Sequence, residues 1–168
     1  MATFLLPCDG SSNALLAVRH VISEARRDAD ARVHLLNVQP PFSAYVARHI
    51  DRETRADFQR ERAEAALAAA RELLDAAGVA YHVHVEVGDK AQRVADAARR
   101  LRCDRIVIGT ARRSALVRAV ENSLTSRLME CSTVPVEVIP GPPAGALERI
   151  GIPAGVVAGV MLPWVGGA

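Results

Sequence analysis

An aspartate stands at the end of the first apolar segment, directly before a predicted helix. The segment is TFLLPCD, and it closes on Asp9 and Gly10. A carboxylate in this place can accept hydrogen bonds from a ribose hydroxyl or from an adenine amino group. The same carboxylate would also stabilise the dipole of the following helix by about 0.3–1 kcal/mol. The residues alone leave these two roles evenly matched.

A glycine follows a second buried segment, in the stretch DRIVIGTARRSALVRAVENS. Gly109 tolerates any backbone angle, and without a Cβ it allows the backbone to approach a phosphate closely. The helix expected after it would offer free N–H groups to an anion. Hydroxyl groups follow at Thr110, Ser114, Ser123 and Thr125. A loop also needs glycine simply to turn, so a lone glycine leaves the phosphate role open.

Other groups of reactive side chains are weaker candidates. His82 and His84 alternate on one predicted strand, and His34 lies on the strand expected beside it, so the three imidazoles could hold zinc. Polar residues are ordinary at a sheet edge, and His84 is expected to face away from His34, so we predict no metal site. Cys8 precedes a helix N-terminus, which could lower its pKa, but the role of a small buried residue is favoured. No Ser-His-Asp or Cys-His set has a suitable placement, and we predict no catalytic residue.

Five apolar segments alternate with four helical ones, and these elements must position the residues above. The expected strands are Thr3–Asp9, Ala31–Pro40, Val79–Asp89, Asp104–Gly109 and Val134–Pro140. The expected helices cover residues 11–27, 54–77, 90–101 and 116–131, with Gly78 ending the second. Such alternation requires parallel strands, right-handed crossovers and helices on both faces. We therefore predict an α/β fold with an open parallel sheet, which binds ligands at the carboxyl ends of its strands.

Composition excludes several classes of function. The formal net charge of +2 and the aromatic content of 4% argue against a nucleic-acid partner. Three scattered cysteines without a CxxC pair indicate reduced thiols and a cytoplasmic protein. No apolar run reaches the roughly 18 residues of a membrane span, so no membrane association is expected.

The last part of the chain differs in composition from the rest. Residues 1–140 are predicted to form one domain, and residues 141–168 are rich in glycine and proline and lack a periodic pattern. A flexible tail is the favoured interpretation. The alternative is that the apolar strip Ile152–Trp164 docks on a partner subunit or peptide, with Trp164 as its anchor.

Taken together, several segments resemble the universal stress protein family of the UspA type. They are FLLPCDGSSNALLAV, VHLLNV, GDKAQRVADAA, CDRIVIGTARRS and NSLTSRLMECSTVPVEVIP. The resemblance covers about the first 140 residues. It implies a Rossmann-like sheet of five parallel strands in the order 3-2-1-4-5. It also implies a homodimer, paired through the last strand at Val134–Ile139.

Nucleotide-binding members of this family share the pattern G-x2-G-x9-G-[S/T]. Here its first glycine falls on Gly109 and its hydroxyl on Ser123, but Arg112 and Asn122 occupy the other two glycine positions. The resemblance also places adenine and ribose contacts on Pro7, Cys8, Asp9, Val38 and Ile108. It places phosphate contacts on Gly109, Arg112, Asn122, Ser123, Leu124 and Thr125. The adenosine half of the site is thus kept, and the phosphate half is altered.

Two bulky residues in the loop favour a weakened or absent ATP site over a retained one. A Cβ at a left-handed backbone angle costs roughly 1–2 kcal/mol, less for asparagine. The opposing interpretation is that Arg112, together with Arg113, binds an anion by charge-assisted hydrogen bonds. The expected function is a non-catalytic stress-response or signalling module. The alternatives are an ATP- or AMP-binding switch with slow hydrolysis, and a hydrolase or ligase of the related adenine-binding α/β group, for which the chain lacks an SGGxDS-like loop.

Overall fold

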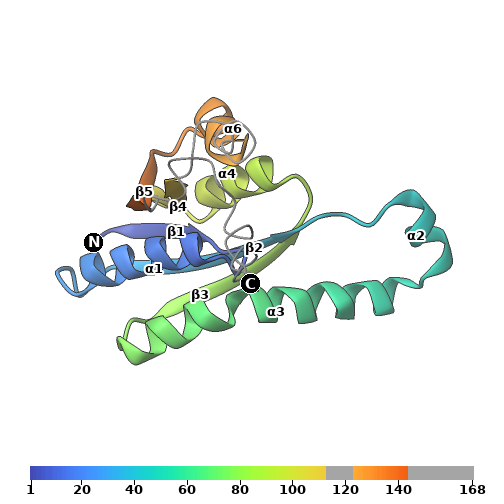
Figure 1. Cartoon of the computed structure of the whole chain (residues 1–168), viewed down its shortest axis with the longest axis horizontal. Coiled ribbons are helices and arrows are strands. Elements are labelled where there is room, and N and C mark those ends of the chain that lie inside the picture. The colour runs from blue at the N-terminus through green and yellow to red at the C-terminus, as the bar shows by residue number, and fades with distance from the viewer. Residues whose placement is uncertain (113–122, 144–168) are drawn as a thin grey trace, which may run out of the picture.

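The computed structural model describes residues 1–112 and 123–143, which contain a five-stranded parallel sheet. The strand order is β3-β2-β1-β4-β5 (Figure 1). The strands are β1 (Thr3–Pro7), β2 (Arg32–Gln39), β3 (Tyr81–Val87), β4 (Arg105–Arg112) and β5 (Val136–Pro143). The α/β fold class and the strand order are therefore confirmed.

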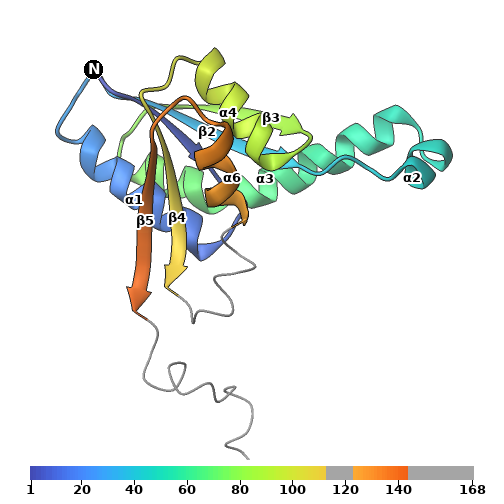
Figure 2. The same ribbon diagram turned by 90° about the horizontal axis from the view of Figure 1, so that it is seen from above.

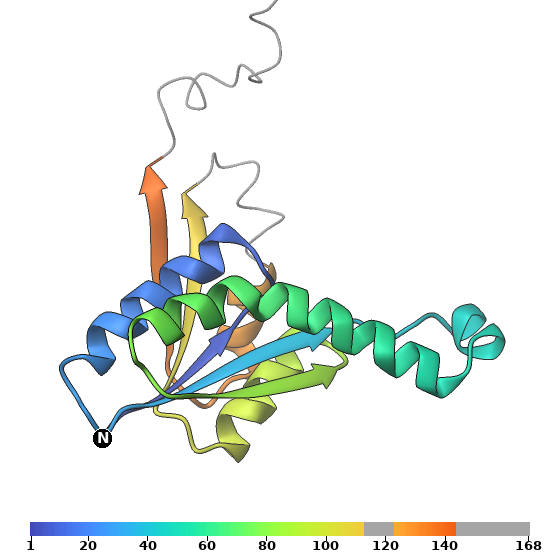
Figure 3. The same ribbon diagram turned by 90° about the horizontal axis from the view of Figure 1, so that it is seen from below.

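Helices cover both faces of this sheet (Figures 2 and 3). The described helices are α1 (Ser12–Ala25), α2 (Ala44–His49), α3 (Arg52–Ala76), α4 (Lys90–Arg100) and α6 (Ser123–Cys131). Helices α1 and α3 contribute buried residues to an apolar cluster on one face, and α4 and α6 contribute to a second cluster on the other. The sheet is thus the middle layer of three.

Short polar side chains start the helices. The hydroxyl of Ser11 accepts the backbone N–H of Ala14 at 3.2 Å, so Ser11 caps α1. Asp51 and Asp89 cap α3 and α4 in the same way. At the other end of α3, Gly78 has a φ of +68°, the left-handed conformation expected of a residue that ends a helix.

The central strand is apolar on both faces. Phe4 and Leu6 point into the cluster under α1 and α3, and Leu5 points into the cluster under α4 and α6. All three are at most 1% exposed. A strand buried on both sides has no need of polar alternation, and this explains the unbroken run TFLLP at the start of the chain.

Several boundaries differ from those expected. Residues 44–49, expected as loop, form α2, whose N-terminus is capped by Ser43 and which has no buried residue. Helix α3 begins at Arg52 rather than Thr54, and its first half projects beyond the sheet with α2 (Figure 1). Strand β4 continues past Gly109 to Arg112, and β5 runs over Val136–Pro143 rather than Val134–Pro140. The predicted tail lies outside the described residues beyond Pro143, as does the strip Ile152–Trp164.

Three histidines gather on β2 and the edge strand β3. The Nδ1 atom of His34 lies 3.1 Å from the Nε2 atom of His84, and the ring of His82 stacks on that of His34 with centroids 5.4 Å apart. The expectation that His84 faces away from His34 is wrong. In the parallel register His34 pairs with His82, and His84 follows two residues later on the same face.

The histidine cluster should make the stability of the protein depend on pH. Burial, His84, His82 and Arg32 lower the pKa of His34 below 6.5. Burial, Arg100 and His82 lower the pKa of His84, against the opposing charge of Glu86. Below pH 6.5 the unfolded chain therefore binds more protons than the folded one, so the free energy of unfolding falls as pH drops from 7.5 to 5.5. Urea unfolding with a chelator present measures this fall, and His84→Gln should reduce it. An unchanged pH dependence in the variant would contradict the prediction.

Within residues 1–112 and 123–143, none of the helices combines the length and the apolar character needed to cross a membrane.

Candidate functional site

The sheet opens between β1 and β4 toward the carboxyl ends of its strands. Their ladder joins Phe4 to Arg105 and Leu5 to Ile106 and ends there, although both strands continue. Figure 3 shows β4 and β5 running in a different direction from β1, β2 and β3. The chain order also changes here, because β2 lies on one side of β1 and β4 on the other. Open α/β sheets bind ligands at this kind of position.

Asp9 is an exposed carboxylate in the turn between β1 and α1. Its Oδ1 atom accepts the backbone N–H of Ser11 at 3.0 Å. Partial burial acts to raise the pKa of Asp9, but hydrogen bonds from Ser11 and the charge of Lys90 outweigh it, so the pKa lies below 3.8. Asp9 is therefore ionised at neutral pH and has lone pairs left for a ligand. The geometry is compatible with both roles that the sequence left open.

Cys8 is fixed in place by β2. Its backbone N–H donates to the carbonyl oxygen of Leu36 at 2.8 Å, and the Nδ2 atom of Asn37 donates to its carbonyl oxygen at 2.7 Å. The Nε2 atom of Gln39 donates to Oδ1 of Asn37 at 2.6 Å. Both amides are buried, Asn37 at 2% exposure and Gln39 at 7%. This pair is not among the residues predicted from the sequence, and the signal for it is two amides in a strand that is otherwise largely apolar.

The Cys8 thiol lies in an environment that favours its protonated form. Burial and the charge of Asp9 raise its pKa to about 12. Burial and the charge of Asp104 likewise raise the pKa of Cys103 to about 11. The favoured interpretation of Cys8 as a buried packing residue fits this environment, since only a thiolate attacks or binds metal.

We expect one cysteine of the native protein to react quickly with a thiol reagent at pH 8. Cys131 is exposed, whereas Cys8 and Cys103 are buried. The two buried thiols should react at least about 100-fold more slowly than Cys131, because burial suppresses both access and ionisation. Ellman's reagent measures these rates, and unfolding in urea should release all three thiols. Cys131→Ser should abolish the fast phase, and a fast phase that survives would show that a buried thiol is accessible.

Gly109 lies inside β4 and touches the first turn of α1. A Cβ built on it would lie 1.7 Å from the carbonyl oxygen of Asn13 and 2.5 Å from its carbonyl carbon. Real Cβ atoms essentially never approach a neighbour to less than 3.0 Å. The contact between helix and strand therefore requires glycine at this position, whether or not a phosphate also approaches.

The other predicted contacts divide between the two faces of the sheet. Val38, Ile108 and Leu124 belong to the cluster under α4 and α6, whereas Cys8 belongs to the cluster under α1 and α3. Val38 is 8% exposed and Ile108 is 7% exposed. Pro7 is half-buried at the end of β1. These side chains are therefore largely occupied in packing, and the backbone N–H and carbonyl of Cys8 are already hydrogen bonded to β2.

The phosphate half is described only in part. The backbone of Arg112 ends β4, where it pairs with Pro143, and Ser123 begins α6. Thr125 is half-buried in the first turn of α6. Asn122 lies outside the described residues. Leu128 is fully buried and anchors α6 in the cluster under α4 and α6. An ion pair of 2.8 Å also joins Arg127 of α6 to Asp89, the cap of α4.

The chain is similar to proteins of known family. A family model described as the universal stress protein family matches residues 1–140. A universal stress protein of Methanocaldococcus jannaschii is 28% identical over 140 residues, covering 82% of this chain and 81% of that protein.

Solved structures show the same similarity in three dimensions. A protein from the universal stress protein family of Burkholderia pseudomallei has 27% identity and a TM-score of 0.63, over 83% of this chain and 96% of that one. A universal stress protein family protein of Arabidopsis thaliana, solved with AMP bound, has 16% identity and a TM-score of 0.61, over 84% of this chain and 93% of that one. At the latter identity the similarity extends to the fold alone.

Proposed function

Because the chain belongs to the universal stress protein family, we propose that it is a non-catalytic stress-response or signalling module with a degenerate ATP-binding loop. It works by contact with other proteins rather than by chemistry on a substrate. The adenosine half of its site keeps the residues expected to contact adenine and ribose, whereas the phosphate half does not hold a triphosphate.

The observation that carries this proposal is the pair of residues in the phosphate loop. Arg112 and Asn122 stand where the nucleotide-binding pattern has glycine. Glycine allows the main chain to contact phosphate oxygens directly, and any Cβ increases that distance. Asparagine tolerates a left-handed backbone angle better than most residues. Arg112 is therefore the more disruptive of the two substitutions.

The adenosine side supports a second candidate, a switch that binds ATP or AMP. Asp9 is an ionised and exposed acceptor, and Asn37 holds the adjoining carbonyl of Cys8. The relative of similar fold from Arabidopsis thaliana carries AMP. A nucleotide with one phosphate depends less on the altered loop than ATP does. Slow hydrolysis belongs to this second candidate only if ATP binds.

Calorimetric titration of the full-length protein with ATP, ADP and AMP tests the proposal. The non-catalytic module predicts no saturable binding of ATP at concentrations that saturate a micromolar site. Binding of AMP alone would favour the second candidate in its AMP form. Binding of ATP with micromolar affinity would overturn the degenerate-loop proposal.

We further propose that the protein is a homodimer paired through the last strand, at the predicted segment Val134–Ile139. In the described residues β5 is an edge strand that pairs only with β4, so its outer edge is free to pair with another chain. Cutting the chain after Pro143 leaves β5 whole, and we expect the dimer to persist. Light scattering at matched concentrations measures this. A full-length monomer would contradict the dimer, and a monomer after truncation only would assign the pairing to the tail.

A further inference from the structure

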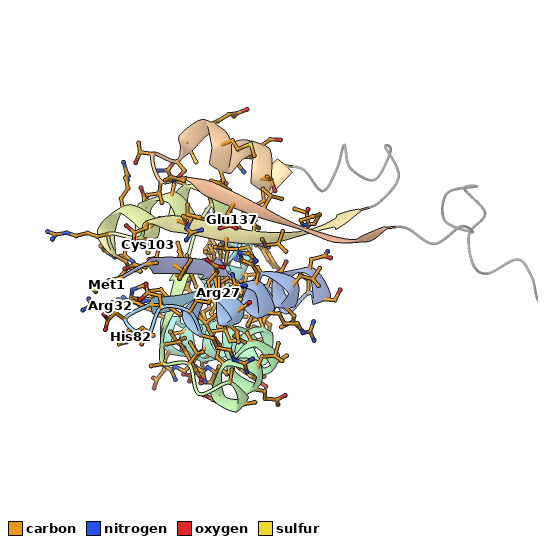
Figure 4. All side chains as sticks on the ribbon, turned by 90° about the vertical axis from the view of Figure 1, so that its left-hand side faces the viewer. Met1, Arg27, Arg32, His82, Cys103 and Glu137 are labelled. Carbon is orange, nitrogen blue, oxygen red and sulfur yellow. The ribbon has the colours of Figure 1, made fainter. Side chains whose placement is uncertain are left out.

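The histidine cluster lies away from the candidate nucleotide site. His82 is the second residue of β3, and Figure 4 shows it at the end of the sheet that also carries Met1, Arg32 and Cys103. These residues mark the amino ends of the strands, whereas Asp9 and Val38 lie toward the carboxyl ends. The cluster therefore shares no residue with the candidate nucleotide site.

The cluster presents two nitrogen atoms at the spacing of metal ligands. Zinc binds imidazole nitrogen at about 2.0–2.1 Å, so two nitrogens on one ion lie roughly 2.9–3.4 Å apart for right-angled to tetrahedral geometry. The measured separation between Nδ1 of His34 and Nε2 of His84 is 3.1 Å. To bind one cation, the two rings would have to turn so that the lone pairs of both nitrogen atoms point at it, in place of the hydrogen bond between the rings.

The surroundings hold these two rings in place and in the right protonation state. His34 is 9% exposed and lies on β2, which pairs with a strand on each side. Burial lowers the pKa of both imidazoles, which favours the neutral form that binds a metal ion. The positive charge of Arg100, which would oppose a cation, is engaged by an ion pair with Glu86.

We propose that His34 and His84 form a binding site for a divalent transition-metal ion of the zinc, copper or nickel class. Imidazole is a preferred ligand of these ions, whereas magnesium and calcium prefer oxygen. Among the described residues, no three His, Cys, Asp or Glu side chains are gathered to hold a metal. The site therefore has two protein ligands, and water completes the coordination. The exposed ring of His82, stacked on that of His34, is a further nitrogen donor on this face.

Calorimetric titration of the untagged full-length protein with ZnCl₂ at pH 7.5 tests this site. We expect one saturable Zn²⁺ per chain, and His84→Gln should weaken it at least about tenfold. His84 is at the sheet edge and half-buried, so this variant is expected to fold, and circular dichroism checks that it does. His34→Gln should weaken binding as much, provided that it folds.

Two control variants separate this site from others on the surface. His49 lies on α2, where its Nδ1 atom is 2.8 Å from the carbonyl oxygen of Tyr45, and Cys131 is the exposed thiol. His49→Gln and Cys131→Ser should leave the affinity unchanged, and Mg²⁺ should not compete. No saturable binding, an affinity unaffected by His84→Gln, a loss caused by either control variant, or displacement by Mg²⁺ would each overturn the proposal.

Discussion

Replacement of Gly109 with alanine is expected to lower the free energy of unfolding by about 3 kcal/mol or more, the upper range for an overpacked core position. The added Cβ would lie 1.7 Å from the carbonyl oxygen of Asn13. That oxygen is backbone, so no side chain can rotate away to relieve the overlap. Helix α1 would have to move away from β4 and lose part of the packing under α1 and α3.

A second glycine provides the matched control. Gly78 ends α3 with a φ of +68°, and a Cβ added there meets no atom within 4 Å. Gly78→Ala should therefore lower the free energy of unfolding only by the cost of a Cβ at a left-handed backbone angle, about 1 kcal/mol. Urea unfolding of the two variants measures the difference. Equal losses in both would show that the contact between Gly109 and α1 is not as close as described.

Replacement of both Arg112 and Asn122 with glycine is expected to raise the affinity for ATP at least about tenfold, or 1.4 kcal/mol. The double variant restores the glycine pattern of the loop, so the main chain can approach the phosphates. The opposing interpretation, in which Arg112 binds phosphate through its guanidinium, predicts the reverse result. The sign of the change thus separates the two.

Arg113→Gly is the control for this experiment. It makes the same change of residue type beside Arg112 but outside the glycine pattern. Its affinity for ATP should equal that of the wild type. If Arg113→Gly raises ATP affinity as much as the double variant does, a general loss of positive charge or bulk is the cause, and the role assigned to Arg112 and Asn122 is wrong.

The strands could be predicted from the sequence because their burial follows from composition. The run TFLLP can bury all of its apolar side chains only between two apolar layers, and it forms the central strand. The cap at Ser11 and the end of α3 at Gly78 follow equally local rules. Helix α2 was missed because none of its residues is buried, so it has no apolar face to give a periodic signal. The strand order came from the family resemblance, since local patterns do not encode it.

The candidate site was predictable only in outline. Asp9 could be located because it ends a strand, but its bond to Ser11 depends on the turn. The hydrogen bond from Asn37 to the carbonyl oxygen of Cys8 joins residues 29 positions apart, and it depends on the register of β1 and β2. The sequence suggests that Gly109 is needed for the approach of a phosphate or for a turn. It does not predict the contact with Asn13, because that contact depends on how α1 lies on β4. Likewise, His34 and His84 meet only through the pairing of β2 with β3.

The most direct test of whether the altered loop excludes ATP is a pair of crystal structures from crystals grown with ATP. One is of the wild-type protein and the other is of the Arg112→Gly, Asn122→Gly variant. The variant serves as the positive control for the conditions. Our account predicts a triphosphate against the main chain beside Gly109 in the variant and none in the wild type. A triphosphate in that position in the wild-type protein would contradict it.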